Sequence, residues 1–361
     1  MTAPPATRVI KAQATKDGAD DTAAEPAARV LRAGGLVAFP TETVYGLGAD
    51  AENPVAIARI YAAKGRPSNH PVIVHLPPQA DIGYWADSIP AQAHQLISAF
   101  WPGPLTLVLK RAARIPGAVS GGQDSVGLRC PSHPVAQALL RAFKQGKGGV
   151  AAPSANKFGH VSPTTAQHVR DEFGAGGRNP VDCILDGGQS AVGIESTILD
   201  LSRSSTHGPV LLRPGHIGAE RIAEIIGILP RMPDAGAPRA SGTLESHYAP
   251  RTPIALVASE QLPDTLQRLL SAEKSVALMH SSVFAFSDAT AQSSCVRIAL
   301  PPAPEDYAHD LYAALRAMDA ANADIILVEA PPNDSKWQGV NDRLRRAAFD
   351  SAGVLSRLLK Q

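Results

Sequence analysis

Two hydrophobic periodicities divide most of the chain into helices and strands. Apolar positions that recur every three to four residues predict amphipathic helices, and short apolar runs predict buried strands. The first pattern predicts helices over residues 22–33, 54–64, 91–100, 134–143, 163–172 and 218–227. The second predicts strands over residues 36–39, 72–74, 105–109, 126–129, 149–152, 182–185, 196–201 and 209–212. Because these strands do not alternate strictly with helices, we expect a mixed sheet.

The pattern changes twice in the second half of the chain. Residues 229–252 are rich in Pro, Gly and Ser with little periodicity, which predicts a long interdomain linker. Strands and helices then alternate, which predicts a small parallel sheet of Rossmann type. We expect its strands at residues 254–257, 276–279 and 325–328, and its helices at 260–272, 304–320 and 338–349. This part contains no GxGxxG motif, so no dinucleotide site is predicted.

Length and cysteine usage favour a protein of two domains in a reducing compartment. The chain has 361 residues, of which 44% are hydrophobic and 19% are charged, as in ordinary globular proteins. Its three cysteines, Cys130, Cys183 and Cys295, lie far apart and form no CxxC pair, so no metal site is predicted and the cytoplasm is expected. We expect no transmembrane segment, and we expect residues 1–22 to form a disordered tail.

The formal net charge of +1 provides no overall field that would hold a polyanion such as tRNA. Any phosphate-binding cluster must therefore be local. The sequence contains no Walker A motif and no set of protein-kinase motifs. If ATP binds, it binds in another kind of site.

Small and polar residues gather at the ends of predicted strands, where α/β sheets bind ligands. Residues 40–48 and 152–156 each follow a strand, and Lys64 and Arg66 follow a helix. A guanidinium suits bidentate phosphate recognition, and an ammonium supplies a point charge. Arg129 is a lone charge in an apolar strand, so it is a candidate carboxylate ligand. Tight turns, helix caps and charges that complement a helix dipole are the structural alternatives.

Taken together, these segments resemble the long form of the YrdC-like family. The matching strings lie in the expected order between residues 23 and 217, and the linker sequence SHYAP and the α/β tail match the long form. Each string alone is moderately specific, whereas seven in register are very specific. They are PTETVYGLG (40–48), IYAAKGRP (60–67), FWPGPLTLVL (100–109), VGLRCP (126–131), APSAN (152–156), GIESTI (193–198) and LLRPG (211–215).

The resemblance implies an α/β fold with two domains. A YrdC-like domain with a twisted mixed sheet and a concave cleft would span residues 23–217. A helix and a linker, which would act as a lid, would span residues 218–252. A smaller Rossmann-like domain would span residues 253–361.

The resemblance also implies a reaction. The chain would make L-threonylcarbamoyl-AMP from L-threonine, bicarbonate and ATP with release of pyrophosphate, as the precursor of a tRNA modification. The carboxylate of N-carboxythreonine would attack the α-phosphorus, so no side-chain nucleophile would be needed. Catalysis would rest on positioning and on stabilisation of negative charge by Lys64, Arg66, Arg213 and magnesium. The downstream threonylcarbamoyl-transfer machinery is an implied partner, whereas stable tRNA binding and membrane binding are not expected.

Carried over residue by residue, the resemblance gives three overlapping sets of site residues. The tetrad that lines the cleft would be Lys64, Arg66, Ser154 and Asn156. The residues near ATP would be Arg66, His70, Ser125, Ser154, Ser162, Arg213 and, as a lid, Tyr248. The residues that hold threonine would be Thr43, His75, Arg129, Ser196 and, through its backbone, Ala152. Family members often have Thr and Asn at the positions of Ser125 and His70, so the chain departs from the family pattern there.

Two other functions compete with this one. A locally basic cleft could accept double-stranded RNA, although the net charge and the aromatic content of 5% argue against high affinity. A carbamoyl transferase related to the hydrogenase-maturation proteins would need extra modules with CxxC pairs, which this chain lacks. The C-terminal domain could bind a regulator, steady the lid or recruit the next enzyme, and the sequence does not separate these roles.

Overall fold

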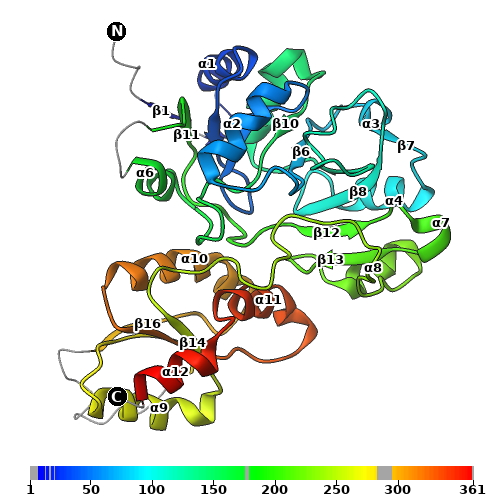
Figure 1. Ribbon diagram of the computed structural model, residues 1–361. Helices are drawn as coiled ribbons and strands as arrows, with labels where there is room; N and C mark the ends of the chain where they lie inside the picture. Colours follow the sequence, from blue (N-terminus) through cyan, green and yellow to red (C-terminus); the bar gives the residue numbers. More distant parts are fainter. Residues whose placement is uncertain are drawn as a thin grey trace. The chain divides into compact units, whose positions relative to one another are not determined.

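The computed structural model in Figure 1 describes residues 7–12, 14–15, 18–19, 21–174, 179–282 and 295–359. The chain forms two compact units. The first consists of Met1–Phe158 and Ser162–Thr243, and the second consists of Gly159–Val161 and Leu244–Gln361. The predicted linker over residues 229–252 is therefore divided between the two units.

A large mixed sheet forms the framework of the first unit and confirms the predicted α/β fold. The strands are β1 (Arg8–Lys11), β2 (Ala14–Thr15), β3 (Gly18–Ala19), β4 (Val37–Phe39), β5 (Gly46–Asp50), β6 (Ile73–His75), β7 (Ala86–Asp87), β8 (Leu105–Arg111), β9 (Ser125–Arg129), β10 (Val150–Ala151), β11 (Cys183–Asp186), β12 (Thr197–Asp200) and β13 (Val210–Arg213). The order across the sheet is β1-β11-β4-β5-β10-β6-β9-β8-β12-β13, with β7 paired to β8, while β2 and β3 pair separately. Parallel and antiparallel pairs are mixed, since β6 runs parallel to β9 and antiparallel to β10.

The helices of the first unit are α1 (Asp21–Arg32), α2 (Pro54–Lys64), α3 (Ile82–Trp85), α4 (Ala91–Phe100), α5 (Pro134–Ala142), η1 (Phe143–Gly146), α6 (Ala166–Gly174), α7 (Ser204–His207) and α8 (Ala219–Ile226). Helix α2 shows how local sequence positions functional groups. Asn53 caps its first turn by accepting from two backbone amides, and Gly65 ends it in the left-handed region at φ = +64°. This stop places Lys64 and Arg66 on either side of the helix end.

Strand β5 lies where the sequence predicted only a loop. The sequence pattern did not predict this strand because Gly46 and Gly48 lie within it, and glycine is unfavourable inside strands. The packing explains them: a Cβ at Gly48 would lie 2.8 Å from Phe39 Cε1 and 2.8 Å from Val150 Cγ1. The strand is buried throughout, so close approach of its neighbours requires glycine there.

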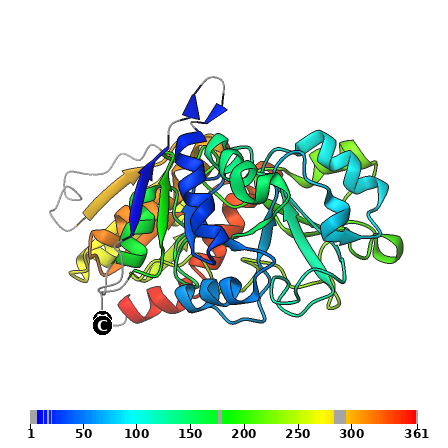
Figure 2. The same ribbon diagram turned by 90° about the horizontal axis from the view of Figure 1, so that it is seen from above.

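The predicted disordered tail over residues 1–22 is wrong for β2, for β3 and for the start of α1, and it is also wrong for residues 8–11. They form β1, which pairs in parallel with β11 in the register Arg8 to Cys183, and Figure 2 shows the two strands side by side. The strand depends on a partner that lies more than 170 residues later, which the local pattern does not reveal. Helix α1 begins one residue earlier than predicted, and α6 begins at Ala166 rather than at residue 163.

The second unit is a four-stranded parallel sheet with helices on both faces, as the Rossmann-like pattern predicted. Its strands are β14 (Ile254–Val257), β15 (Val276–His280), β16 (Cys295–Ala299) and β17 (Ile325–Glu329), in the order β14-β17-β15-β16. Its helices are η2 (Ser259–Gln261), α9 (Leu262–Ser271), α10 (Pro304–Ala320), η4 (Ser335–Trp337), α11 (Gln338–Ala347) and α12 (Ser351–Leu359). The sequence did not predict β16 or α12.

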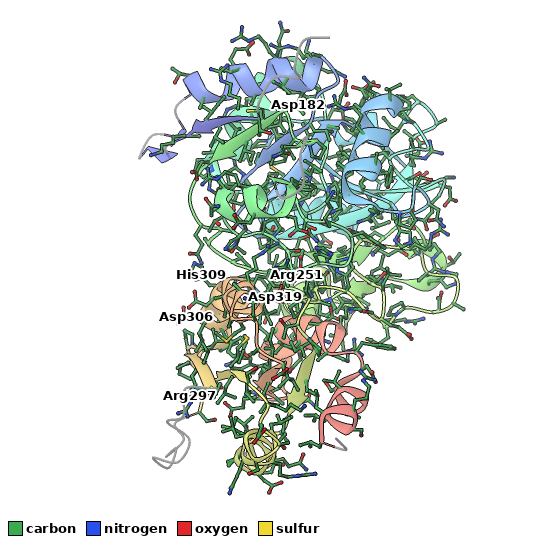
Figure 3. All side chains as sticks on the ribbon, turned by 60° about the vertical axis from the view of Figure 1, so that its left-hand side comes forward. Asp182, Arg251, Arg297, Asp306, His309 and Asp319 are labelled. Atoms are coloured by element: carbon green, nitrogen blue, oxygen red, sulfur yellow. The ribbon has the colours of Figure 1, made fainter. Side chains whose placement is uncertain are left out.

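Helices α9 and α12 cover one face of this sheet, and α10 and α11 cover the other (Figure 1). The chain that enters β14 is fixed to α10, because Arg251 and the amide of Thr252 both bond to Asp319 (Figure 3). In the described part of the chain, every helix is too short or too polar to cross a membrane.

Candidate active site

Three predicted threonine-binding residues meet on neighbouring strands of the first unit. His75 ends β6, where it pairs with Arg129 of β9 on one side and Val150 of β10 on the other. Ala152 follows β10, and its amide donates to the carbonyl of Ile73 at 2.9 Å. The backbone group of Ala152 that would reach a ligand is therefore its carbonyl. The strand register brings together residues that are far apart in the sequence.

His75 provides a neutral imidazole beside a guanidinium. Its side chain is almost completely buried, and its Nδ1 lies 3.3 Å from the carbonyl oxygen of Ile73. Burial, with the nearby charge of Arg129, lowers the pKa of His75 to about 3. At neutral pH the ring can exchange hydrogen bonds with a ligand but adds no charge.

This lowered pKa predicts acid sensitivity. Between the unfolded pKa of about 6.5 and the folded pKa of about 3, the unfolded chain binds a proton that the folded chain does not, so stability falls as the pH falls. From about pH 7 to about pH 5.5, His75 should remove roughly 1 kcal/mol of unfolding free energy. Urea denaturation at both pH values measures this loss. The His75→Gln variant should not show this pH-dependent loss of unfolding free energy. The control variant His94→Gln, at an exposed position, should show the same loss as the wild type. Equal pH dependence in all three proteins would contradict the prediction.

Arg129 is held from one side by a buried carboxylate. Its Nη2 donates to Glu42 Oε1 at 2.6 Å and its Nε donates to the carbonyl of Gly103 at 3.3 Å. The side chains of Arg129 and Glu42 are only 4% and 8% exposed. The second oxygen of Glu42 accepts from the amide of Ser132 at 3.0 Å, which fixes the carboxylate. No hydrogen bond from the described residues engages Nη1, so one edge of the guanidinium is available for an external carboxylate.

The ammonium of Lys64 ties α2 to the segment that holds Ser154 and Asn156. It donates to the backbone carbonyls of both residues. Burial, and then the charge of Arg66, hold the pKa of Lys64 well below its usual value. The contacts of Lys64 therefore bring all four residues of the predicted tetrad into one region of the first unit.

Arg66 and Arg213, both predicted to bind ATP, are linked through Ser241. The guanidinium nitrogens Nη1 and Nη2 of Arg66 lie 3.3 and 3.4 Å from Ser241 Oγ, and Arg213 Nη1 donates to the Ser241 carbonyl at 2.8 Å. Arg213 also donates to the carbonyl of Ser196 at 2.9 Å, and Ser196 Oγ lies 2.8 Å from Thr106 Oγ1. This chain of contacts joins predicted ATP-binding residues to a predicted threonine-binding residue.

The remaining predicted residues of the first unit lie in or beside these loops. Buried Thr43 shares a 2.9 Å contact with Thr41, and Ser162 Oγ donates to Glu195 at 2.5 Å. Ser125 is buried at the start of β9. His70 packs edge-on against Phe158, over which Arg66 also lies, with its guanidinium carbon 5.8 Å from the ring centre. Burial, followed by the charge of Arg66, lowers the pKa of His70.

Comparison with known proteins matches both units. Residues 29–215 match the family described as "Telomere recombination" (Sua5_yciO_yrdC), and residues 217–349 match "Threonylcarbamoyl-AMP synthase, C-terminal domain". A threonylcarbamoyl-AMP synthase of Pyrococcus abyssi is 36% identical over 89% of this chain and 93% of its own length. One from Bacillus subtilis is 39% identical over 89% of this chain and 92% of its own length. The chain belongs to the threonylcarbamoyl-AMP synthase family.

The solved structures agree with this family. The crystal structure of P. abyssi Sua5 complexed with L-threonine is 34% identical to the chain, with a TM-score of 0.83. The similarity covers 96% of this chain and 98% of that chain, so it includes both units. The long-form resemblance of the sequence is confirmed.

Tyr248, which the sequence predicted to act as a lid, belongs to the second unit. It adopts a left-handed conformation at φ = +60°. Its ring lies 4.2 Å from that of His247 and 5.8 Å from that of Tyr312, with the guanidinium carbon of Arg343 at 5.4 Å. These contacts fix the ring within the second unit, and the role of Tyr248 as a lid remains a prediction.

Three residues that the sequence analysis left without a role are central to the observed geometry. Glu42 holds Arg129, Glu195 accepts from Ser162, and Ser241 joins Arg66 to Arg213. Glu42 and Glu195 lie inside the family strings PTETVYGLG and GIESTI, so their positions were a usable signal. Ser241 lies in the irregular linker, where no pattern marked it.

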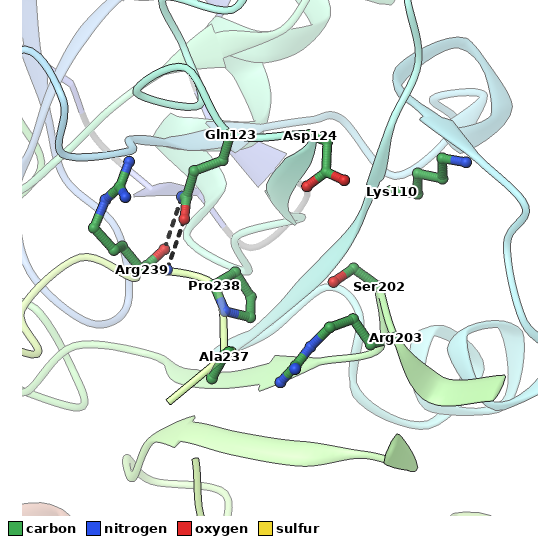
Figure 4. A pocket seen from close by; sticks show the side chains of 9 residues that line it. Lys110, Gln123, Asp124, Ser202, Arg203, Ala237, Pro238 and Arg239 are labelled. Carbon is green, nitrogen blue, oxygen red and sulfur yellow. Dashed lines mark hydrogen bonds between the residues drawn. The ribbon is translucent and has the colours of Figure 1, made fainter. Parts of the chain in front are cut away.

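The linker segment over residues 236–241 forms walls of two cavities in the first unit. The larger, of about 470 Å³, includes Gln123 and Arg239, whose amide groups exchange hydrogen bonds at 2.7 and 3.1 Å (Figure 4). A narrow cavity of about 20 Å³ shares these two residues and reaches Ser125 and Ser241. Residues 236–241 therefore belong structurally to the surroundings of the predicted ATP-binding residues.

Proposed function

We propose that this chain synthesises L-threonylcarbamoyl-AMP from L-threonine, bicarbonate and ATP, with release of pyrophosphate. Membership of the family supports the reaction. The observation that carries the proposal within this chain is the series of contacts from Arg66 through Ser241 and Arg213 to Ser196, which joins predicted ATP-binding residues to a predicted threonine-binding residue. A carboxylate ligand and a phosphate ligand can thus be held by the same set of loops.

The threonine end of the site would use Arg129 for the substrate carboxylate. The nitrogen that donates to Glu42 is Nη2, so a carboxylate that binds at Nη1 would not have to displace that ion pair. The neutral ring of His75 would complete the pocket without repelling the substrate ammonium. The L-threonine in the solved relative supports this part of the proposal.

The ATP end would use Arg66 and Arg213 on the phosphates. Arg66 donates to the carbonyl of Pro71 and contacts the hydroxyl of Ser241, and Arg213 donates to the carbonyls of Ser196 and Ser241. Phosphate oxygens carry negative charge, so they are stronger acceptors for a guanidinium than carbonyl or hydroxyl oxygens, and they can be bound in the bidentate geometry that arginine favours. The carboxylate of N-carboxythreonine would then attack the α-phosphorus, and pyrophosphate would leave with the negative charge held by the two arginines.

Magnesium is proposed as the cation that accompanies ATP. Within the described ranges, no group of three or more His, Cys, Asp and Glu side chains is arranged to hold a metal ion. Mg²⁺ usually keeps several waters and binds substrate phosphates with one or two carboxylates, so an ion that arrives with ATP fits this site. Buried Glu195, which accepts a hydrogen bond from the predicted ATP-binding residue Ser162, is a carboxylate that would hold it. When bound, the ion would neutralise part of the phosphate charge.

The full chain should release pyrophosphate and form the adenylate only when ATP, L-threonine and bicarbonate are all present. Omission of threonine or bicarbonate should return pyrophosphate release to background, because the attacking carboxylate is built from both. Mass spectrometry of the adenylate and a coupled pyrophosphate assay measure the two products. Salt-dependent RNA binding without threonine-dependent turnover would instead support the RNA-binding function.

The product would pass to the machinery that transfers the threonylcarbamoyl group to tRNA. We propose no stable tRNA complex for this chain itself, since its net charge of +1 provides no overall field that would hold a polyanion. Filter binding of a tRNA at low and physiological salt measures this affinity.

A further inference from the structure

Another cavity lies in the second unit, and none of the predicted site residues lines it. Its volume is about 530 Å³, within the usual range of roughly 300–1,000 Å³ for small-molecule sites. Its walls come from the residues that follow three parallel strands: Ser259 after β14, Ser281 and Ser282 after β15, and residues 330–332 after β17. The cavity therefore lies at the carboxyl edge of the sheet, where open α/β sheets bind ligands.

The topology explains why the sheet opens at this point. After β14 the chain turns to α9 on one face, whereas after its neighbour β17 the chain turns to α11 on the opposite face. The connections from two adjacent strands thus diverge, which creates a crevice outside their carboxyl ends. The crevice therefore occurs at the position where such sheets bind ligands, although this part of the sequence has no glycine-rich loop of a dinucleotide site.

One buried carboxylate organises the floor of this cavity. Glu329 ends β17 and is only 2% exposed. Its Oε1 accepts from the hydroxyls of Ser259 and Ser282, and its Oε2 accepts from the amides of Ser281 and Ser282 at 2.7 and 2.9 Å. Because the hydroxyl protons of Ser259 and Ser282 point to Glu329, these two serines can offer the cavity only oxygen lone pairs.

The lining is therefore rich in acceptors and negatively charged. Glu260 and Glu329 supply carboxylates, and none of the described residues that line the cavity is Lys, Arg or His. Trp337 and three prolines (Pro302, Pro331 and Pro332) supply rigid apolar walls. A phosphate or carboxylate ligand would find no counter-charge here, whereas an ammonium group would find several acceptors beside an aromatic ring.

A buried hydroxyl behind the wall also calls for an explanation. Tyr307 packs edge-on against Trp337, with ring centres 5.3 Å apart, and is only 1% exposed. Its hydroxyl has no hydrogen-bond partner among the described residues. Burial of an unpaired hydroxyl is costly, so unpaired groups of this kind are rare in proteins and often mark ligand or water sites.

We propose that this cavity binds a small organic ammonium compound, with its charged group among Ser259, Ser281 and Ser282 and its apolar part against Trp337. The lining defines this class of ligand. It offers hydrogen-bond acceptors but no cationic side chain, and it has a rigid apolar wall and a preformed floor. The site gives the second unit a ligand of its own, independent of the reaction proposed for the first unit.

Three probes with nearly the same aromatic body test the charge of the ligand. Tyramine carries an ammonium, 4-hydroxyphenylethanol carries a hydroxyl, and 4-hydroxyphenylacetate carries a carboxylate. Titration calorimetry with the full chain should show tyramine binding at least about tenfold more tightly than the alcohol, a difference typical of one charge-assisted contact, with no binding of the acid. Equal binding of the acid, or no binding of tyramine, would overturn the proposal.

Two matched substitutions test the location. Ala330→Leu fills the cavity from the end of β17 and should weaken tyramine binding by at least about tenfold. Ala321→Leu adds the same side chain between α10 and β17, at the amino edge of the sheet, and should leave binding unchanged. The melting temperature of each variant shows whether it is folded. Unchanged affinity in a folded Ala330→Leu protein would place tyramine elsewhere and contradict the proposal.

Discussion

Arg66→Ala should lower the rate of pyrophosphate release by about 10²–10³, equivalent to about 3–4 kcal/mol of transition-state stabilisation. Arg66 is buried at the end of α2, where it contacts Ser241 and the carbonyl of Pro71. Its proposed task is to stabilise charge that develops on the phosphates, so its loss should act on kcat more than on the KM for threonine. Initial rates at varied ATP and threonine concentrations measure both constants.

Two further variants sharpen this test. Arg66→Lys keeps a positive charge but loses the planar fork, so its rate should lie between those of the wild type and the alanine variant. Arg221→Ala removes an exposed arginine of α8 that pairs with Glu224 of the same helix, and its rate should equal that of the wild type. Near-normal turnover in Arg66→Ala would remove Arg66 from the mechanism.

Glu42→Ala should lower the free energy of unfolding by about 3–5 kcal/mol, because it leaves the buried guanidinium of Arg129 without its counter-charge. It should also raise the KM for threonine, since the carboxylate fixes the direction of the Nη1 edge. Urea denaturation measures the first effect, and steady-state rates at saturating ATP measure the second.

A double variant separates stability from substrate binding. Replacing both partners, as Glu42→Leu with Arg129→Met, removes the unpaired charge, and such replacements are often neutral or stabilising. The double variant should therefore be more stable than Glu42→Ala, yet it should have lost threonine-dependent turnover. If Glu42→Ala is as stable as the wild type, the ion pair is not the structural element described above. If the double variant retains turnover, Arg129 does not hold the substrate.

The sequence predicted the parts of the site that depend on local pattern. Arg129 was a lone charge in an apolar strand, and Lys64 and Arg66 flanked a helix stop, so their chemistry was visible before the fold was known. Glu42 had the right chemistry but no visible partner, because its contact with Arg129 spans 87 positions. The role of Ser241 could not be predicted for a different reason. It lies in the irregular linker, which has no periodicity from which the direction of a side chain could be inferred.

The fold shows the same division. Strands with apolar runs were predicted within one or two residues, since period and burial act locally. Strand β5 was missed because its glycines reflect close packing against Phe39 and Val150 rather than a turn. Strand β1 was missed because an edge strand is stabilised by its neighbour, and β11 follows more than 170 residues later.

The division of the chain into units limits how it can be shortened. Gly159–Val161, flanked on both sides by residues of the first unit, belong to the second. There the amide of Ala249 donates to Gly159, and Arg316 donates to the carbonyl of Val161. A protein truncated anywhere between residues 217 and 243 would keep this tripeptide and lose every one of those partners. The tripeptide follows Ser154 and Asn156 and precedes Ser162. Truncation would therefore remove the hydrogen bonds of Ala249 and Arg316 to a segment that lies between predicted ATP-binding residues.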